Sequence, residues 1–312
     1  MNSAYFAIGY KCNHRCLFCP REYSDFEEML PYDLLVNNVN EVIENSKIQH
    51  LIVSGGEPTM HSDFLKFMDY LMTKNITIAL LTNGDNFSDF EYSNEFIKIV
   101  DPRRVQIVTA IHSIDPKKHD WLTGSEGSYA RTLKGLLYLK DHGYSIGIKF
   151  IVSKQNYKES ALFVKDILEK FEGRVNIQFC GIDCAGNANQ YGEMAAVNYQ
   201  EAKPYIEEAM DVFLKYQKEH NQVGRLSAIE IPLCSVDPYY WKFFVLKDRT
   251  KLQAYSAPNY KQNEEHLAYA SGNDCDTYFE KCQDCKVKNV CPGIWRKTGE
   301  IIGEESVKPI VE

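Results

Sequence analysis

Short apolar segments, rich in β-branched and aromatic residues, alternate along this chain with amphipathic segments whose apolar positions recur every three or four residues. The first pattern predicts strands and the second predicts helices. The predicted strands cover Tyr5–Gly9, His50–Ser54, Thr77–Thr82, Arg104–Ala110, Ser145–Val152 and Arg174–Phe179. The predicted helices between them cover about Pro31–Asn45, Ser62–Lys74, Ser88–Val100, Tyr129–Asp141 and Tyr157–Phe171.

Such an alternation predicts an α/β fold with a parallel sheet, helices on its outer face and functional loops at the carboxyl ends of the strands. Six strand–helix units indicate a full or partial barrel of the (β/α)6, TIM-like kind. After Phe179 the alternation weakens, with a helix predicted at about Tyr199–Glu219 and a strand at Ala228–Leu233. We place a boundary near residue 225, which leaves 1–224 as the barrel and 225–312 as a smaller C-terminal domain.

The composition is that of an ordinary globular protein, with 312 residues, 44% of them hydrophobic and 25% charged. A formal net charge of −8 argues against nucleic acid or an anionic membrane as a partner. Met1–Gly9 has neither a basic start nor a long apolar stretch, and no run of about 18 apolar residues occurs. We therefore expect a cytoplasmic protein without a membrane span.

The chain has ten cysteines, which indicate either a disulfide framework or metal ligation. They are clustered: three lie near the start, four near the end and three between. Disulfides stabilise most where they close long loops in small secreted domains, whereas clustered thiolates in a large cytoplasmic protein are typical of iron or zinc sites. The clustering favours metal ligation.

The first cluster follows the first predicted strand, in the sequence KCNHRCLFCP. At this CxxxCxxC spacing, Cys12, Cys16 and Cys19 can bind three corners of a cube-shaped four-iron cluster and leave the fourth iron open for chemistry. Phe18 precedes the last cysteine, where an aromatic ring can cover a ligand of that iron. The alternative is a structural zinc site with His14 as a fourth ligand, although His14 is poorly placed between the cysteines.

This motif and a second one together resemble the radical S-adenosylmethionine (radical SAM) superfamily. Its members carry CxxxCxφC after the first strand of a partial (β/α)6 barrel and GGEP after the second, which here is Gly55-Gly56-Glu57-Pro58. The resemblance implies that the three cysteines hold a 4Fe-4S cluster to which SAM binds, and that the GGEP segment hydrogen-bonds the methionine amino group of SAM. The glycines allow close backbone approach, and Glu57 supplies an acceptor.

Other segments match the superfamily in part. Thr82-Asn83-Gly84 ends the third strand like the turn that borders the SAM pocket in relatives, but an Asn-Gly turn also forms without a ligand. The fourth strand ends near His112, where relatives often have an acid that contacts SAM, so His112 is either a pocket residue or a packed one. Arg131 lies near a position where relatives bind the SAM carboxylate, and it equally suits a helix surface.

The resemblance also implies a mechanism. An electron from the reduced cluster cleaves SAM, and the resulting 5′-deoxyadenosyl radical abstracts a hydrogen atom from the substrate. The cofactor supplies this chemistry, while the protein positions the target carbon and excludes water. The electron would come from a donor such as flavodoxin or ferredoxin.

The second cluster consists of Cys275, Cys282, Cys285 and Cys291, followed by Pro292-Gly293. It resembles the SPASM and twitch extensions of radical SAM enzymes, which implies one auxiliary 4Fe-4S cluster. The spacing alone also suits zinc.

Three cysteines between the clusters leave alternatives open. Cys234 could replace Cys275 as the fourth ligand of the auxiliary site. Cys180 and Cys184, in the sequence FCGIDC, are either ligands near the barrel mouth or ordinary small buried residues.

Three functions compete. The first, which we favour, is a maturase that installs a crosslink, thioether or epimerised centre in a ribosomally made peptide. The aromatic-rich stretch Pro238–Tyr260 could offer a surface for such a peptide. The second is a small-molecule radical SAM enzyme of cofactor, nucleoside or antibiotic biosynthesis. The third is a non-catalytic metal-binding protein.

Overall fold

A computed structural model describes residues 3–21, 29–246, 253–255 and 277–311. Within these ranges, eight strands form one sheet in the order β7-β6-β5-β4-β3-β2-β1-β8, and every neighbouring pair is parallel. The strands are β1 Ser3–Ala7, β2 His50–Ser54, β3 Thr77–Leu81, β4 Val105–Ala110, β5 Ser145–Val152, β6 Asn176–Gly181, β7 Leu226–Ile229 and β8 Gln253–Tyr255.

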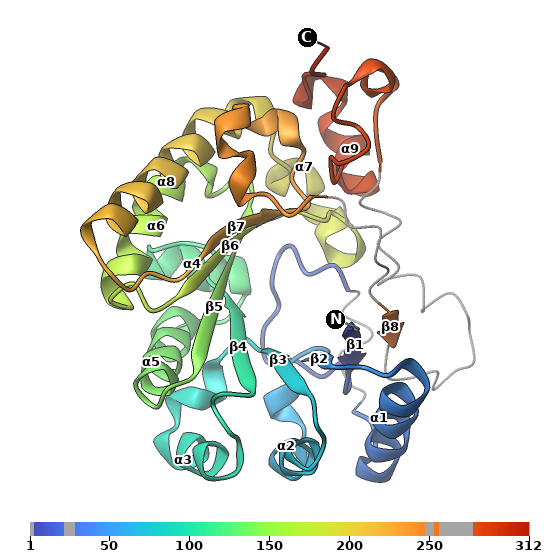
Figure 1. Cartoon of the computed structure of the whole chain (residues 1–312), viewed down its shortest axis with the longest axis vertical. Coiled ribbons are helices and arrows are strands. Elements are labelled where there is room, and N and C mark those ends of the chain that lie inside the picture. Colours follow the sequence, from blue (N-terminus) through green and yellow to red (C-terminus); the bar gives the residue numbers. More distant parts are fainter. Residues whose placement is uncertain (1–2, 22–28, 247–252, 256–276, 312) are drawn as a thin grey trace.

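The sheet curls into a partial barrel, and helices cover its convex outer face (Figure 1). The helices are α1 Tyr32–Ser46, α2 Phe64–Met72, α3 Phe90–Ile99, α4 Pro116–Thr123, α5 Ser128–Asp141, α6 Ser160–Lys170, α7 Gly192–Ala195, α8 Tyr199–Glu219 and α9 Arg296–Ile302. The loop after β1 lies inside the curve of the sheet (Figure 1). None of the helices in the described ranges is long and apolar enough to cross a membrane.

The predicted α/β partial barrel is confirmed, with seven consecutive parallel strands in place of the six expected. The strand expected at Ala228–Leu233 lies instead at Leu226–Ile229. It ends there because Glu230 has a positive φ of 58°, which turns the chain out of the extended conformation, and Pro232 follows. The predicted boundary near residue 225 therefore falls just before a strand of the barrel sheet.

Helix α4 was not predicted, because its eight residues are mostly polar and form no clear apolar stripe. Local signals at its ends explain why it forms. The Asp115 side chain accepts a hydrogen bond from the backbone of Lys117, Pro116 occupies the first turn, and Gly124 ends the helix with a φ of 59°. Helix α4 thus ends beside the loop that carries Cys12, Cys16 and Cys19, referred to below as the cysteine loop. The backbone of this loop donates hydrogen bonds to the end of the helix.

The core lies between the outer face of the sheet and its helices, as the alternation of buried positions on β4 and the apolar faces of the helices indicate. Phe150 of β5 packs against Phe163 of α6, with 4.3 Å between ring centroids, and against Phe179 of β6 at 5.2 Å. All three rings are fully buried. This aromatic cluster joins the helical layer to the middle of the sheet.

Phe163→Ala should lower the free energy of unfolding by about 3–5 kcal/mol, because it leaves a cavity under α6. Leu162→Ala is the matched control on the same helix: Leu162 is 56% exposed, and its loss should change stability by less than about 0.5 kcal/mol. Urea unfolding followed by circular dichroism measures both. Equal effects would contradict the placement of α6.

Candidate functional site

Cys12, Cys16 and Cys19 lie on the loop that follows β1, at the carboxyl edge of the parallel sheet. All three are half-buried. Burial raises the pKa of each thiol, to about 12 for Cys12, and the neighbouring Cys19 and Cys12 raise that of Cys16 further. Such thiols stay protonated unless a metal binds the sulfur and displaces the proton. This donor set suits an iron–sulfur cluster.

The GGEP segment after β2 presses against this cysteine loop. Gly56 N–H donates to the carbonyl of Gly9 (2.9 Å), and Glu57 N–H donates to that of Lys11 (2.8 Å). A Cβ atom on Gly55 would lie 2.1 Å from the Gly9 oxygen, and one on Gly56 would lie 2.2 Å from the oxygen of Tyr10. Only glycine fits at both positions, so the pair allows the two backbones to meet.

The carboxylate of Glu57 is buried and joins the end of β2 to the end of β3. One oxygen, Oε1, accepts from the backbone N–H and hydroxyl of Thr59 (3.0 and 2.6 Å) and from the hydroxyl of Thr82 (2.6 Å). The other, Oε2, accepts from Asn83 N–H (2.5 Å). Burial raises the pKa of Glu57, and these hydrogen bonds oppose the rise only in part. Pro58 begins the short 3-10 turn that contains Thr59.

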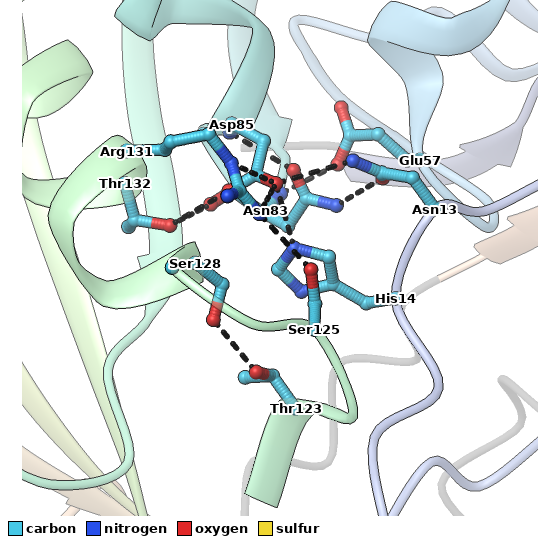
Figure 2. Close-up of polar contacts among 12 residues, drawn as sticks. Asn13, His14, Glu57, Asn83, Asp85, Thr123, Ser125, Ser128, Arg131 and Thr132 are labelled. Atoms are coloured by element: carbon cyan, nitrogen blue, oxygen red, sulfur yellow. Dashed lines mark hydrogen bonds and ion pairs between the residues drawn. The ribbon is translucent and has the colours of Figure 1, made fainter. Parts of the chain in front are cut away.

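Asp85, which follows the Thr82-Asn83-Gly84 turn, is the centre of an ion-pair network (Figure 2). Its Oδ2 lies 3.1 Å from Nε2 of His14 in the cysteine loop and accepts from Nε and Nη2 of Arg131 at 3.0 and 2.9 Å. Burial opposes ionisation of Asp85, but His14 and Arg131 together hold its pKa below the ordinary value. Asp85 was not among the predicted site residues; its place directly after a strand-end turn was the available signal.

Two asparagines strengthen this link between the cysteine loop and the turn (Figure 2). Asn83 donates from Nδ2 to Oδ1 of Asn13 (2.7 Å), and Asn13 donates from its own Nδ2 to Asp85 (3.3 Å). Thr132 of α5 donates to the carbonyl of Asn83 (2.8 Å). The network therefore connects the loop after β1, the turn after β3 and helix α5.

Phe18 of the cysteine loop, His112 and His119 form a buried aromatic group. The rings of Phe18 and His112 meet edge to face with 4.8 Å between centroids, and His112 N–H donates to Nδ1 of His119 (3.2 Å). Burial lowers the pKa of both histidines, that of His119 to about 4, so both are neutral at pH 7. His112 Nδ1 has no hydrogen-bond partner among the described residues.

The loop is also held from two further sides. Arg15 and Leu17 donate backbone hydrogen bonds to Thr123 and Leu122 at the end of α4, both at 2.9 Å, and Ala188 N–H donates to the carbonyl of Cys19 (3.1 Å). The three cysteines thus lie on a backbone that four segments of the barrel fix in place. This arrangement can present thiolates in a set geometry to a metal cluster.

The C-terminal cysteines Cys282, Cys285 and Cys291 line a cavity, together with Cys234. The fourth predicted ligand, Cys275, lies outside the described residues. In the described part of the chain, no three Cys, His, Asp or Glu side chains converge on one point as the ligands of a single metal ion would. The four thiols instead surround a shared space, which suits a multi-iron cluster because each iron takes one thiolate.

Cys180 and Cys184 are buried within the barrel part of the molecule. Cys180 belongs to β6, and Cys184 follows that strand, where its N–H donates to the Thr298 hydroxyl of α9 (3.2 Å). The same hydroxyl donates to the carbonyl of Ile182 (2.6 Å). The loop after β6 therefore attaches α9 to the barrel.

A comparison with protein families identifies the class of protein to which such a site belongs. The model of the Radical SAM superfamily matches residues 6–163, which is half of the chain. The chain therefore belongs to the radical SAM superfamily and is an enzyme of that class. Membership implies a 4Fe-4S cluster and SAM as cofactors.

Curated relatives differ in how much of this chain they share. The tungsten-containing aldehyde ferredoxin oxidoreductase cofactor-modifying protein of Pyrococcus furiosus is 23% identical over 93% of this chain and 89% of its own length. The antilisterial bacteriocin subtilosin biosynthesis protein AlbA of Bacillus subtilis is 26% identical over 50% of this chain, which spans 34% of that protein.

Solved structures share the fold over nearly the whole chain. Streptococcus suis SuiB bound to its precursor peptide SuiA matches with a TM-score of 0.64, at 14% identity, over 98% of this chain and 74% of that one. The protein anSMEcpe with bound AdoMet and Cp18Cys peptide matches with a TM-score of 0.60, at 12% identity, over 99% and 93%. Both are SPASM-domain enzymes.

Asp85→Asn should lower the free energy of unfolding at pH 7 by about 1–3 kcal/mol, because it removes a buried charge that is paired with Arg131 and lies 3.1 Å from Nε2 of His14. The matched control is Asp101→Asn. Asp101 pairs with Arg103, which is 88% exposed, so this change should have no measurable effect. Urea denaturation of the three proteins measures the difference.

The pH dependence of that difference tests whether the ion pairs cause it. The pKa of folded Asp85 lies below its ordinary value of 3.8, so its stabilising contribution is complete above that pH and is lost as the pH falls through the lower folded-state pKa. The gap between the wild type and Asp85→Asn should narrow in acid. A gap that stays constant from neutral pH to below the folded-state pKa would contradict an ionic origin.

Proposed function

We propose that this enzyme uses SAM to abstract a hydrogen atom from a ribosomally made peptide and so installs a crosslink, a thioether or an epimerised centre. The observation that carries the SAM chemistry is the contact between the cysteine loop and the GGEP segment. That contact places three mutually close thiols beside a buried acceptor at the carboxyl edge of a parallel sheet. In parallel α/β folds, this edge is where ligands bind.

In this proposal Cys12, Cys16 and Cys19 hold the 4Fe-4S cluster. These thiolates would hold the cluster so that, when reduced, it could supply one electron to SAM; the chemistry thus provided would be cleavage of the sulfur–C5′ bond to methionine and a 5′-deoxyadenosyl radical, which would take a hydrogen atom from the substrate. Phe18 and His112 border the place of SAM, since their buried rings pack together beside the thiols. The Gly55–Pro58 segment and Thr82-Asn83 border it from the other side, joined through Glu57.

The hydrogen bonds of Glu57 and Arg131 support a different role for each residue. Glu57 already accepts four protein hydrogen bonds, and Oε2 accepts only one of them, so Oε2 has capacity for a further donor such as an amino group. Arg131 is committed to Asp85, Ser125 and the carbonyl of Glu126. It therefore acts in this proposal as a positioning residue for the cysteine loop and leaves the SAM carboxylate to other groups.

The peptide substrate is supported by the printed descriptions of the relatives. AlbA takes part in the biosynthesis of a bacteriocin, and both SuiB and anSMEcpe carry a bound peptide. The alternative, a small-molecule or cofactor substrate, is supported by the Pyrococcus furiosus protein, because its description is cofactor modification and it matches 93% of this chain. The clustered thiols require a reducing compartment, so the proposal places the enzyme in the cytoplasm, with a flavodoxin or ferredoxin as electron donor.

Anaerobically reconstituted protein should convert SAM to 5′-deoxyadenosine when a strong reductant is added. Cys16→Ala should abolish this product, because it removes a cluster ligand. Cys184→Ala is the matched control: it removes a buried thiol that lies off the cysteine loop and should retain cleavage. Liquid chromatography quantifies the product, and its absence from iron-loaded wild type would sink the proposal.

If a short peptide is encoded beside the gene, its deuterated form should transfer deuterium to 5′-deoxyadenosine, because the radical takes its hydrogen from the substrate. Mass spectrometry of the peptide should show loss of two hydrogen atoms for a crosslink or thioether: one is taken by the radical, and the other leaves as a proton while its electron passes to an iron–sulfur cluster. Epimerisation in heavy water should instead replace one hydrogen atom of the peptide by a solvent-derived deuterium. If the peptide stays unchanged and a small molecule of the same cells is consumed with SAM, the alternative substrate class is correct.

A further inference from the structure

The cavity that holds the C-terminal cysteines is built from two distant parts of the chain. Cys282, Cys285 and Cys291 belong to the segment 277–311, whereas Cys234 lies on a 3-10 turn, Leu233–Ser235, shortly after β7. All four side chains line the same space. The barrel therefore contributes one thiol to a site that is otherwise made by the C-terminal segment.

Contacts outside the cavity hold Cys234 in this place. Its sulfur accepts the backbone N–H of Lys308 (3.4 Å). Its carbonyl accepts from Nε2 of Gln200 on α8 (3.2 Å), and the same Nε2 reaches the carbonyl of Ser306 (3.4 Å). Gln200 thus connects the turn that carries Cys234 to the C-terminal segment. These three hydrogen bonds keep Cys234 close to the other three thiols.

Backbone donors also point at two of the other sulfurs. Cys291 accepts from the N–H groups of Leu233 (3.4 Å) and Gly293 (3.5 Å), and Cys285 accepts from that of Ile310 (3.5 Å). Hydrogen bonds of this kind stabilise negatively charged sulfur and set the reduction potential of iron–sulfur clusters. The sulfurs of Cys285 and Cys291 therefore have the backbone donors that stabilise the negative charge of a metal-bound thiolate.

The remainder of the lining fits a cluster as well. Its apolar members exclude water, and one cation, Lys288, offsets negative charge. The apolar lining residues are Pro232, Phe279, Val287, Ile294, Val307 and Pro309. A largely apolar cavity bordered by four thiols suits a cube with one thiolate on each iron.

We propose that Cys234 is the fourth thiolate ligand of an auxiliary 4Fe-4S cluster whose other ligands are Cys282, Cys285 and Cys291. The inference rests on the proposed function, in which this radical SAM enzyme carries a second cluster. It replaces Cys275 with a thiol from the barrel. The cluster then links the turn after β7 directly to the C-terminal segment.

Iron counting tests this assignment in a chain with Cys12→Ala, Cys16→Ala and Cys19→Ala, where all bound iron belongs to the auxiliary site. This chain should hold about four irons after anaerobic reconstitution. Adding Cys234→Ala should remove most of that iron or leave the electron paramagnetic resonance signal of a three-iron cluster. Adding Cys275→Ala, the matched control, should preserve all of it.

Two results would overturn the assignment: an unchanged four-iron signal with Cys234→Ala, or zinc in place of iron in the triple variant. Failure of the proposed function is separate, because it shows as absent 5′-deoxyadenosine in wild type even when the auxiliary iron is present.

A measurement on the unmutated protein covers the case in which Cys234→Ala does not fold. Alkylation with iodoacetamide and mass spectrometry should show Cys234 protected in the iron-loaded protein and labelled, together with Cys282, Cys285 and Cys291, after iron is removed by chelation. Cys184, buried elsewhere, should label equally before and after. Equal labelling of Cys234 in both states would refute its role as a ligand.

Discussion

The backbone that leaves β2 meets the backbone of the cysteine loop without any side chain between them, and the rest of the site is arranged around this contact. Two main-chain hydrogen bonds, from Gly56 and Glu57, join the segments, and added Cβ atoms on Gly55 and Gly56 would overlap carbonyl oxygens of the loop. Connecting loops are ordinarily more mobile than the elements they join. The described part of this loop, which carries the three cysteines, is held at the carboxyl edge of the sheet, so its thiols occupy set positions.

Charge in this region is buried but distributed so that each group has a counterpart. Asp85 faces His14 and Arg131, and Glu57 is satisfied by hydroxyl and backbone donors. Unpaired buried charge is expensive, whereas hydrogen-bonded networks can make a site rigid. The exceptions are the cysteine thiols, whose ionised forms burial opposes. The cost of burying these thiolates arises where a cationic iron–sulfur core would offset it.

The C-terminal segment is joined to the barrel at two places that differ in chemistry. Thr298 of α9 makes hydrogen bonds to the loop after β6, at Ile182 and Cys184. The second place brings Cys234 to the C-terminal thiols, with Gln200 as the tie. The barrel and the segment therefore share both a packing contact and a set of metal-ligating side chains. A rearrangement of the barrel at these contacts would therefore also displace the C-terminal segment.

The sequence by itself determined the α/β partial barrel, most element positions and the two cysteine clusters, because periodicity and short spacings are local properties that survive without knowledge of the fold. Only the tertiary structure decided the partners of these residues. Asp85 reaches Arg131 across 46 positions and Asn13 across 72, and Leu233, next to Cys234, reaches Cys291 across 58. Such pairs leave no periodic trace. They depend on which strand ends come together at one edge of the sheet, and this is a property of the folded chain.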